Sequence, residues 1–377
     1  MNHQWPGKTS ILPEIMKASN YKEALTAFAG YNVGSRNLIP EKISVQPLDH
    51  GLINHTYKAY GDSIPPFILQ EINKEVFTKP QYVQENYLSI WQYAEFEFKD
   101  LNLPAPVYCD KNTTLFIDSN EHYWRAFELI DNTTTLSIAK NPQQAKATAK
   151  AFAKFTAAFH DFNVAQLRNI IPDFHNLSFR YEEMEKAEKG ELYERIAKAQ
   201  PVIRELRERE RYRHFYEIIT SSDEFPLRVM HHDAKISNVL FSNVSGRVIC
   251  LVDFDTVMPG YFFSDLGDMI RSMACNHDEN YLNFEKIKIR KNYYEAILSG
   301  YLSVMKKYLT ESEKKYIHYA GLLMIYMQAL RFITDFMNGG IYYKVEYKGQ
   351  NFDRALNQLT LLERLEEFLK TEYDVKI

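Results

Sequence analysis

The chain has 377 residues, with 45 lysines and arginines against 49 aspartates and glutamates, a formal net charge of −4. Hydrophobic residues at 45% and charged residues at 25% are ordinary for globular proteins and argue against a disordered or fibrous chain. The near-neutral balance supplies no basic surface of the size that nucleic acid binding needs. At about 150 residues per domain, the length predicts two domains or two large lobes.

Cysteine usage and the first residues indicate the compartment. Cys109, Cys250 and Cys275 are odd in number and widely spaced, so the chain offers no disulfide framework and no CxxC metal site. The N-terminal sequence has no basic segment followed by a continuous apolar stretch, the mark of a secretory signal. The most apolar window, 320–330, is shorter than the roughly 20 residues of a membrane span. We therefore expect a cytoplasmic protein without a membrane partner.

Residues 1–130 predict a mixed α and β region. Pro13 is well placed to open a short amphipathic helix over 13–29. Runs of apolar residues separated by turn residues then predict a small antiparallel sheet, with strands at 43–48, 55–60 and 66–70. Apolar residues recur at helical spacing over 80–98. A further strand pair is expected at 114–117 and 123–130.

From residue 131 the pattern becomes mainly helical. A stripe rich in alanine and phenylalanine predicts a helix over 145–162. Charges of both signs at i,i+4 spacing over 181–219 predict solvated helices that break at Pro201. Three more helices are expected, the second apolar enough to be central, at 284–306, 312–338 and 352–372. Together these patterns predict an α+β chain of two lobes, residues 1–130 and 131–377.

The most informative stretch is VMHHDAKISNVLFSNVSGRVICLVDFDTVMPG, residues 229–260. Asp233 follows two histidines and precedes Asn238 by five residues, which is the H-x-D-x-x-x-x-N spacing of kinase catalytic loops. Two β-type runs joined by a polar turn then predict a hairpin, with strands at 239–241 and 248–252. Asn238 opens the first strand and Asp253 closes the second, so both lie at the same end, where neighbouring strands are about 4.8 Å apart. Two oxygen ligands there suit Mg²⁺.

The position of Asp233 just before the hairpin suits phosphoryl transfer. That chemistry needs one carboxylate to orient and deprotonate an acceptor hydroxyl, and separate ligands for the metal that bridges the phosphates. The alternative is structural: Asp233 and Asn238 cap the loop, and Asp253 and Asp255 form turns. It leaves the spacing, the hairpin and the D-F-D terminus as coincidences.

The catalytic loop, the hairpin and the D-F-D terminus resemble the aminoglycoside phosphotransferase and choline kinase superfamily. Within it, the chain is similar to the N-acetylhexosamine 1-kinases, through segments that run in the same order over nearly the whole chain: HGLINHTY (50–57), FILQEINKEVF (67–77), YWRAFELI (123–130), IPDFHN (171–176), VDFDTVMPG (252–260), SDLGDMIR (264–271), LRFITDFMNGGIYYK (330–344) and RALNQLTLL (354–362). The resemblance implies a protein-kinase-like fold with a small antiparallel sheet lobe that carries a helix and a large, mainly helical lobe. It also implies phosphorylation of the anomeric hydroxyl of GlcNAc or GalNAc with ATP and Mg²⁺.

The same resemblance implies roles for individual residues. Asp233 would be the catalytic base, with Asn238 and Asp253 holding Mg²⁺. The candidates for nucleotide binding are Gly51, Leu52, Asn54, Thr56, Gln70, Glu128 and Ile130. The candidates for sugar binding are His50, Asp233, Arg331 and Tyr342. Structural support of the site is expected from His231, Asp255 and Asp265.

Two details leave alternatives open. Many relatives carry a lysine on the third strand to hold the phosphates, but here Gln70 stands there. Either Gln70 binds the nucleotide, or Mg²⁺ and backbone amides meet the phosphate charge. Arg331 interrupts an apolar helix and needs partners, which could be a sugar or Asp335 at i+4. Ser264 is expected as the N-cap of a helix through Cys275.

Two other functions compete with the hexosamine kinase. The first is a kinase of another hydroxyl substrate, such as an aminoglycoside, choline or homoserine. The second is a pseudokinase that only binds a ligand, for which Gln70 is the sole support. The expected partners are a nucleotide and a small sugar, and the expected assembly is a monomer or weak homodimer.

Overall fold

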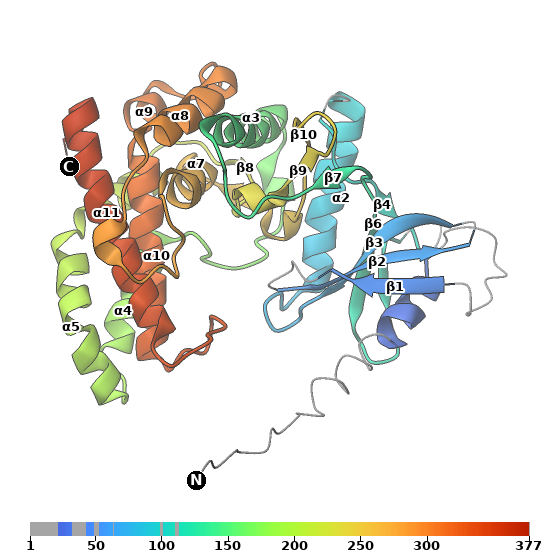
Figure 1. The fold of residues 1–377 in the computed structure, drawn as a ribbon, viewed down its shortest axis with the longest axis horizontal. Helices are drawn as coiled ribbons and strands as arrows, with labels where there is room; N and C mark the ends of the chain where they lie inside the picture. Colours follow the sequence, from blue (N-terminus) through green and yellow to red (C-terminus); the bar gives the residue numbers. More distant parts are fainter. Residues whose placement is uncertain are drawn as a thin grey trace, which may run out of the picture. The chain divides into compact units, whose positions relative to one another are not determined.

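The computed structural model describes residues 22–31, 43–48, 53–62, 64–98, 101–109 and 113–376 (Figure 1). The chain forms two compact units, the first from residues 1–88 and 104–131 and the second from residues 89–103 and 132–377. The boundary expected after residue 130 falls next to Asp131, the last residue of the first unit, but the second unit also takes residues 89–103. Among the described residues, no helix is long and apolar enough to cross a membrane.

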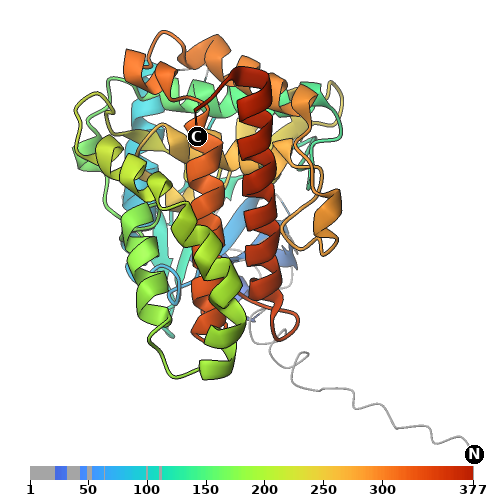
Figure 2. The ribbon, with the colours of Figure 1, turned by 90° about the vertical axis from the view of Figure 1, so that its left-hand side faces the viewer.

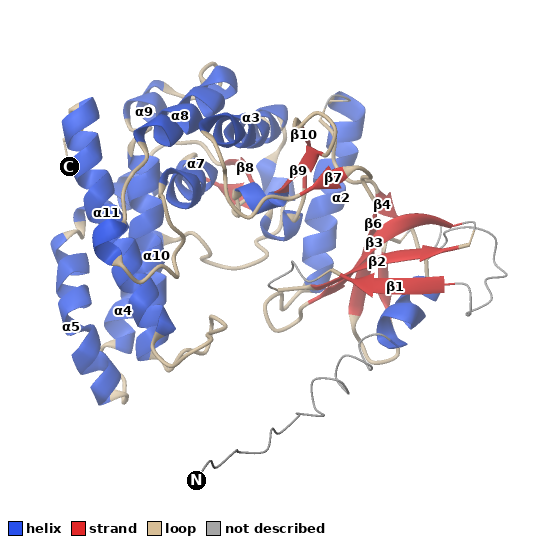
Figure 3. Cartoon of the chain, in the orientation of Figure 1, coloured by secondary structure: helices blue, strands red, loops and turns tan. Residues whose placement is uncertain are grey.

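An antiparallel sheet dominates the first unit (Figure 3). Its order is β1-β2-β3-β6-β4, and β5 also pairs with β6. The strands are β1 (Ile43–Pro47), β2 (His55–Gly61), β3 (Ile64–Ile72), β4 (Pro106–Val107), β5 (Leu115–Ile117) and β6 (Tyr123–Glu128). The three predicted strand runs and the later strand pair are thereby confirmed, as is the helix expected over 80–98, here α2 (Pro80–Glu97).

One face of this sheet forms the core of the first unit. Alternate residues point to it, because successive side chains of a strand face opposite sides. They pack against a helix over residues 22–29, the described end of the helix expected over 13–29. Phe28 stacks on Phe67 with ring centroids 5.1 Å apart. The Tyr31 hydroxyl donates a hydrogen bond to the Trp124 carbonyl at 2.6 Å, which satisfies a buried polar group.

Helices make up most of the second unit, and Figure 2 shows α10 and α11 side by side. The α-helices that follow residue 132 are α3 (Pro142–Ala158), α4 (Leu177–Ala187), α5 (Tyr193–Glu208), α6 (Arg211–Thr220), α7 (Phe263–Met269), α8 (Lys291–Met305), α9 (Glu311–Lys315), α10 (Tyr319–Met337) and α11 (Gln350–Tyr373). From Ala320 to Met337 every residue except Arg331 is buried, so the expectation of a central apolar helix is confirmed. The single helix expected over 312–338 is wrong, because the chain turns between α9 and α10.

The break expected at Pro201 is also wrong. Helix α5 continues through this proline, although an interior proline loses one hydrogen bond and costs about 3 kcal/mol. The same helix buries a continuous apolar stripe of Ile196, Ala199, Val202, Ile203 and Leu206. Burial of each valine, isoleucine or leucine side chain contributes roughly 1.5 to 3 kcal/mol to stability. The packing of the stripe therefore outweighs the cost of the proline.

Short β elements carry the predicted catalytic loop, residues 231–238. The predicted hairpin is present as β9 (Val239–Ser242) and β10 (Val248–Leu251), which pair antiparallel, and β7 (Thr133–Thr134) joins β9. Before the loop, β8 (Arg228–Met230) pairs with β11 (Met258–Gly260). The chain therefore enters and leaves the region 231–257 at neighbouring points, which holds the loop at both ends.

Candidate active site

The side chain of Asp233 is fixed by two neighbours in its own loop. The amide nitrogen of Asn238 donates to the Asp233 carboxylate at 2.8 Å and to its backbone carbonyl at 2.9 Å. The Lys235 ammonium lies 2.8 Å from the same carboxylate oxygen. Burial alone would raise the pKa of Asp233, but the charge and hydrogen bond of Lys235, with help from Asn238, hold it below the usual value. Asp233 is thus an ionised acceptor at neutral pH.

Lys235 is a residue that the sequence reasoning missed, although it stands only two positions after Asp233. We expect Lys235→Met to raise the pKa of Asp233, because its main favourable charge partner is lost. If ionised Asp233 is needed for turnover, the acidic limb of the kcat/KM profile then moves to higher pH. Steady-state kinetics over a pH series measures the shift. Lys314→Met, which removes a lysine paired with Glu311 instead, is the matched control, and an unmoved limb in Lys235→Met would contradict the prediction.

Asn238 and Asp253 lie at one end of the hairpin. Asn238 ends the short 3-10 helix η3 (Ile236–Asn238) and directly precedes β9. Its carbonyl accepts a hydrogen bond from the Val252 amide at 3.0 Å, which brings the residue before Asp253 against it. The amide nitrogen of Asn238 points to Asp233, so its amide oxygen is directed away from that carboxylate.

This donor pair can be tested against Mg²⁺. Among the described residues, no group of three or more His, Cys, Asp or Glu side chains could hold a metal ion, so an all-protein metal cage is absent there. Mg²⁺ bound with a nucleotide needs only one or two protein oxygens, because phosphates and waters complete its octahedron. Asn238, which is 4% exposed, and Asp253, which is exposed, fit that requirement.

The backbone is strained at both sides of this site. His232 has φ of 65° and Asp253 has φ of 67°, in the left-handed region that costs most residues about 1 kcal/mol or more. Such strain persists only where the surroundings hold it, and it gathers at functional sites. Here it affects the residue before Asp233 and one of the two candidate metal ligands.

Asp265 holds the catalytic loop from α7. Its two carboxylate oxygens accept the backbone amides of His231 at 2.9 Å and His232 at 2.7 Å. His231 itself is buried, and its Nε2 lies 3.0 Å from the Val252 carbonyl. Burial lowers the pKa of His231 to about 4, so the ring is neutral and Nε2–H donates to that carbonyl. Asp255 is buried in the 3-10 helix η4 (Phe254–Thr256) that follows Asp253.

The expected role of Ser264 is wrong. Helix α7 begins at Phe263, its N-cap is Phe262, and no side chain caps it. Ser264 lies one position inside the helix and is fully buried. Its hydroxyl contacts His175 and His232, two partners far away in sequence.

Arg331 and Tyr342, two of the residues expected to bind the sugar, are in contact in the second unit. The Arg331 guanidinium lies 3.4 Å from the Tyr342 hydroxyl and packs over three rings, those of Phe174, Tyr342 and Tyr343, with the guanidinium 5.1 to 5.6 Å from their centroids. The alternative ion pair with Asp335 does not form. Asp335 instead accepts three backbone amides, from Ile341, Tyr342 and Tyr343, and the side chain of Asn351. It thus fixes the loop that carries Tyr342, which sequence reasoning did not foresee.

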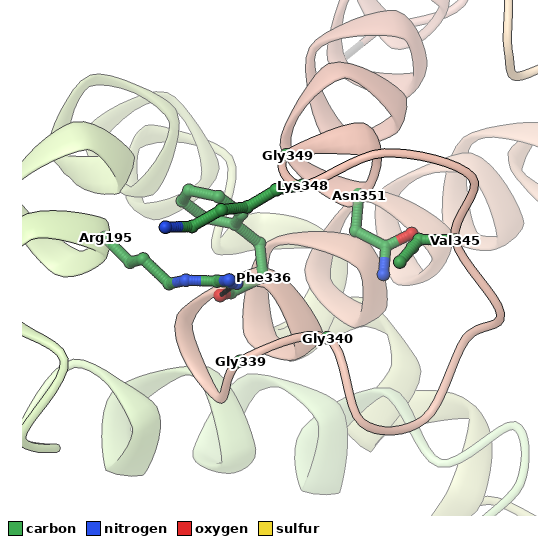
Figure 4. A pocket seen from close by; sticks show the side chains of 8 residues that line it. All are labelled: Arg195, Phe336, Gly339, Gly340, Val345, Lys348, Gly349 and Asn351. Atoms are coloured by element: carbon green, nitrogen blue, oxygen red, sulfur yellow. Dashed lines mark hydrogen bonds between the residues drawn. The ribbon is translucent and has the colours of Figure 1, made fainter. Parts of the chain in front are cut away.

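A small cavity lies on this loop (Figure 4). Arg195 and Lys348 are among the residues that line it, and the Arg195 guanidinium donates to the Phe336 carbonyl at 2.9 Å. Its volume of about 20 Å³ is room for one water molecule. It is therefore too small to receive a sugar.

Two of the expected nucleotide-binding residues, Thr56 and Gln70, lie opposite each other in one row across β2 and β3. Gly51, Leu52 and the sugar candidate His50 lie outside the described residues. The Asn54 side chain accepts the backbone amide of Asn73 at 2.9 Å. The Gln70 side chain donates to the Thr56 hydroxyl at 3.0 Å. Glu128 ends β6, is exposed, and donates its backbone amide to Ala105 at 2.8 Å, while Ile130 is half-buried two residues later.

A buried arginine stands beside Gln70. Arg125 pairs with Gln70 in the register of β3 and β6, and its Nε and Nη2 donate to the Gln70 amide oxygen at 3.2 and 3.0 Å. Arg125 is only 1% exposed and packs over the ring of Phe127. The sequence signal was an arginine inside the apolar run of 123–130. It supplies a positive charge in the row where the usual lysine is missing.

Comparison with known proteins identifies the family of the chain. The model of the phosphotransferase enzyme family matches residues 44–303, well over half of the chain. The chain belongs to that family. The matched residues run from β1 into α8 and include the predicted catalytic loop, the hairpin and α7.

Solved structures with the same fold include three small-molecule kinases. A microcompartment-associated aminopropanol kinase is 16% identical, with a TM-score of 0.56 over 93% of this chain and 98% of that one. An amicoumacin kinase in complex with AMP-PNP, Ca²⁺ and Ami is 11% identical, with a TM-score of 0.58 over 96% of each chain. The choline kinase of Cryptosporidium parvum Iowa II is 15% identical, with a TM-score of 0.53 over 93% and 96%. The expected kinase-like fold, with an antiparallel sheet lobe and a helical lobe, is confirmed, and the family to which the chain belongs is one of phosphotransferase enzymes.

Proposed function

We propose that this phosphotransferase is an ATP- and Mg²⁺-dependent kinase of N-acetylhexosamines, acting on the anomeric hydroxyl of GlcNAc or GalNAc. The observation that carries the proposal is Arg331 among three aromatic rings. Aromatic faces suit the apolar face of a sugar, and a guanidinium can hydrogen bond its hydroxyl and amide oxygens. The segments quoted from the sequence support the same substrate.

The catalytic role in this proposal belongs to Asp233. Ionised and oriented by Asn238 and Lys235, its carboxylate would accept the proton of the acceptor hydroxyl as that oxygen attacks the γ-phosphorus of ATP. Mg²⁺ on Asn238 and Asp253 would neutralise charge on the β- and γ-phosphates. Lys235 lies beside Asp233 and would add positive charge near the transferred group.

The first unit would hold the nucleotide. Gly51, Leu52, Asn54 and Thr56 would cover its phosphates, and the backbone of Glu128 to Ile130 would meet the adenine. The neighbour solved with AMP-PNP and Ca²⁺ supports a nucleotide and a divalent cation as the cofactors. Gln70 would act by holding Arg125, whose charge replaces that of the missing lysine.

Cationic acceptors are the second candidate class, because neighbours include choline and aminopropanol kinases. The rings around Arg331 already surround one cation, so choline or an aminoglycoside would meet a like charge there. A neutral hexosamine has no such penalty. A pseudokinase is disfavoured by the ionised Asp233 and by the Asn238 and Asp253 pair.

Arg331 gives a prediction for the acceptor site. We expect Arg331→Met to raise KM for GlcNAc about 10- to 100-fold, because a charge-assisted hydrogen bond to a substrate contributes roughly 1.5 to 3 kcal/mol. KM for ATP should stay within about twofold. Arg195→Met, which removes an arginine from the water-sized cavity, is the matched control. An unchanged KM for GlcNAc in Arg331→Met would contradict the sugar-binding role.

A substrate panel tests the proposal as a whole. Radiolabelled ATP and Mg²⁺ are incubated with GlcNAc, GalNAc, glucose, choline and kanamycin, and label in the acceptor is counted. Transfer to GlcNAc or GalNAc above the other acceptors supports the proposal. Transfer to choline or kanamycin alone would show that the second class is right, and no transfer to any acceptor would favour a pseudokinase.

A further inference from the structure

Three polar side chains, the buried His232 and Ser264 and the half-buried His175, meet next to the catalytic loop. The Ser264 hydroxyl lies 2.7 Å from Nδ1 of His232 and also contacts Nδ1 of His175. The two histidine Nδ1 atoms are 3.1 Å apart, and Nε2 of His232 lies 3.3 Å from the Pro259 carbonyl. His232 directly precedes Asp233, and the proposed catalytic chemistry uses none of these three side chains.

The contacts of this cluster fit a simple order of hydrogen bonds. Burial lowers the pKa of His232 to about 4 and that of His175 well below its usual value, so both rings are neutral at pH 7. The Pro259 carbonyl can only accept, so Nε2 of His232 carries the proton and its Nδ1 accepts from the Ser264 hydroxyl. The Ser264 oxygen then accepts from Nδ1–H of His175. The Ser264 hydroxyl, both ring nitrogens of His232 and Nδ1 of His175 then each have a partner.

The cluster acts on a strained residue. His232 is in the left-handed region, with φ of 65°, where a residue stays only if its surroundings hold it. On one side its ring packs against Gly260, where an added Cβ would lie 2.7 Å from Nε2. On another side, His232, His175 and Ser264 border a cavity of about 160 Å³. Packing alone therefore leaves the ring room to move, and its orientation depends on Ser264 and His175.

The cluster also reaches the acceptor side of the second unit. His175 stacks on Phe174 with ring centroids 4.5 Å apart and an interplanar angle of 12°. Phe174 in turn lies under the Arg331 guanidinium. A continuous chain of contacts thus runs from Arg331 through Phe174, His175 and Ser264 to the residue before Asp233.

We propose that Ser264 and His175 are positioning residues that hold His232 in its left-handed conformation and thereby set the position of the Asp233 carboxylate relative to the acceptor. The proposal rests on the proposed role of Asp233 as the catalytic base. It adds a role for the IPDFHN segment, residues 171–176, which links the catalytic loop to Arg331.

Ser264→Ala is the first test, with GlcNAc and MgATP as substrates. We expect kcat per folded enzyme to fall about 10- to 100-fold, because a displacement of about 1 Å at a reacting group has an effect of that size. KM for ATP should stay within about twofold. Ser272→Ala, which removes a serine hydroxyl that donates to the Asp268 carbonyl four residues earlier, is the matched control and should keep full activity. Thermal unfolding gives the folded fraction of each variant.

Variants of His232 separate positioning from simple support of the fold. Asparagine tolerates the left-handed region and places an oxygen near the position of Nδ1, so His232→Asn should keep kcat within about threefold. His232→Gly keeps the backbone conformation accessible but loses the tether, and should lower kcat about tenfold or more. Adding Ser264→Ala to His232→Gly should then change nothing, because Ser264 acts through the absent ring. Gly260→Ala should push the ring away and give the kinetic defect of Ser264→Ala.

The outcomes distinguish this inference from the proposed function. Wild-type kcat in Ser264→Ala, in an enzyme that Asp233→Asn inactivates, would overturn the inference and leave the proposed function intact. Should Ser264→Ala not fold, equal kcat values for His232→Asn and His232→Gly would overturn it in the same way. Full activity of Asp233→Asn would overturn both.

Discussion

We expect Asp233→Asn to lower kcat about 10³-fold, since loss of a positioned general base has an effect of roughly 10² to 10⁴. The amide has nearly the shape of the carboxylate, so the fold should be kept. The amide cannot take up the proton of the substrate hydroxyl, and it loses the ion pair with Lys235. The affinity for MgATP should change little, because the nucleotide contacts are assigned to other residues. Steady-state kinetics and nucleotide titration by fluorescence measure the two quantities.

Asp223→Asn is the control for this variant. Asp223 is exposed in the turn before β8, so the same change of charge there should leave kcat unchanged. If Asp233→Asn turns over at more than about a tenth of the wild-type rate, Asp233 is not the base. The loop-capping alternative for Asp233 and Asn238 would then be the better interpretation.

The second large effect is expected at Asp253. Replacing it with alanine should lower kcat at least about 10²-fold and raise the Mg²⁺ concentration needed for half-maximal rate, because one of the two protein oxygens for the ion is lost. The half-maximal Mg²⁺ concentration is read from initial rates at fixed ATP. Alanine also has to adopt the left-handed φ of 67°, which is unfavourable for it.

A second variant removes that ambiguity. Asp253→Asn tolerates the left-handed backbone and changes only the charge of the ligand, so the altered Mg²⁺ dependence should persist. Wild-type Mg²⁺ dependence in Asp253→Asn would mean that Asp253 does not hold the ion. Asp223→Asn again serves as the control for a lost surface carboxylate.

Features encoded by nearby residues could be predicted from the sequence. The hairpin follows from two β-type runs around a polar turn, and the spacing from Asp233 to Asn238 is short enough for the loop to fold on itself. The strands of the first unit follow from alternation of apolar residues. These signals lie within one or two elements, where local propensity and pattern decide the structure.

Features that depend on tertiary contacts could not. Ser264 reads as a helix cap, but its hydroxyl contacts His232, 32 residues away, and His175, 89 residues away. Arg125 and Gln70 are 55 residues apart, so their hydrogen bonds are visible only once β3 and β6 pair. Pro201 reads as a break, but the packing of α5 outweighs it. In each case a distant partner decides the role.

Phosphorus NMR of the reaction product tests the central proposal most directly. GlcNAc is incubated with MgATP and the enzyme, and the new sugar phosphate signal is recorded with proton coupling. We predict a phosphate coupled to the single anomeric proton, as expected for an ester at C1. A phosphate coupled to the two protons on C6, as expected for an ester at C6, would contradict the proposal. So would the absence of any sugar phosphate with both GlcNAc and GalNAc.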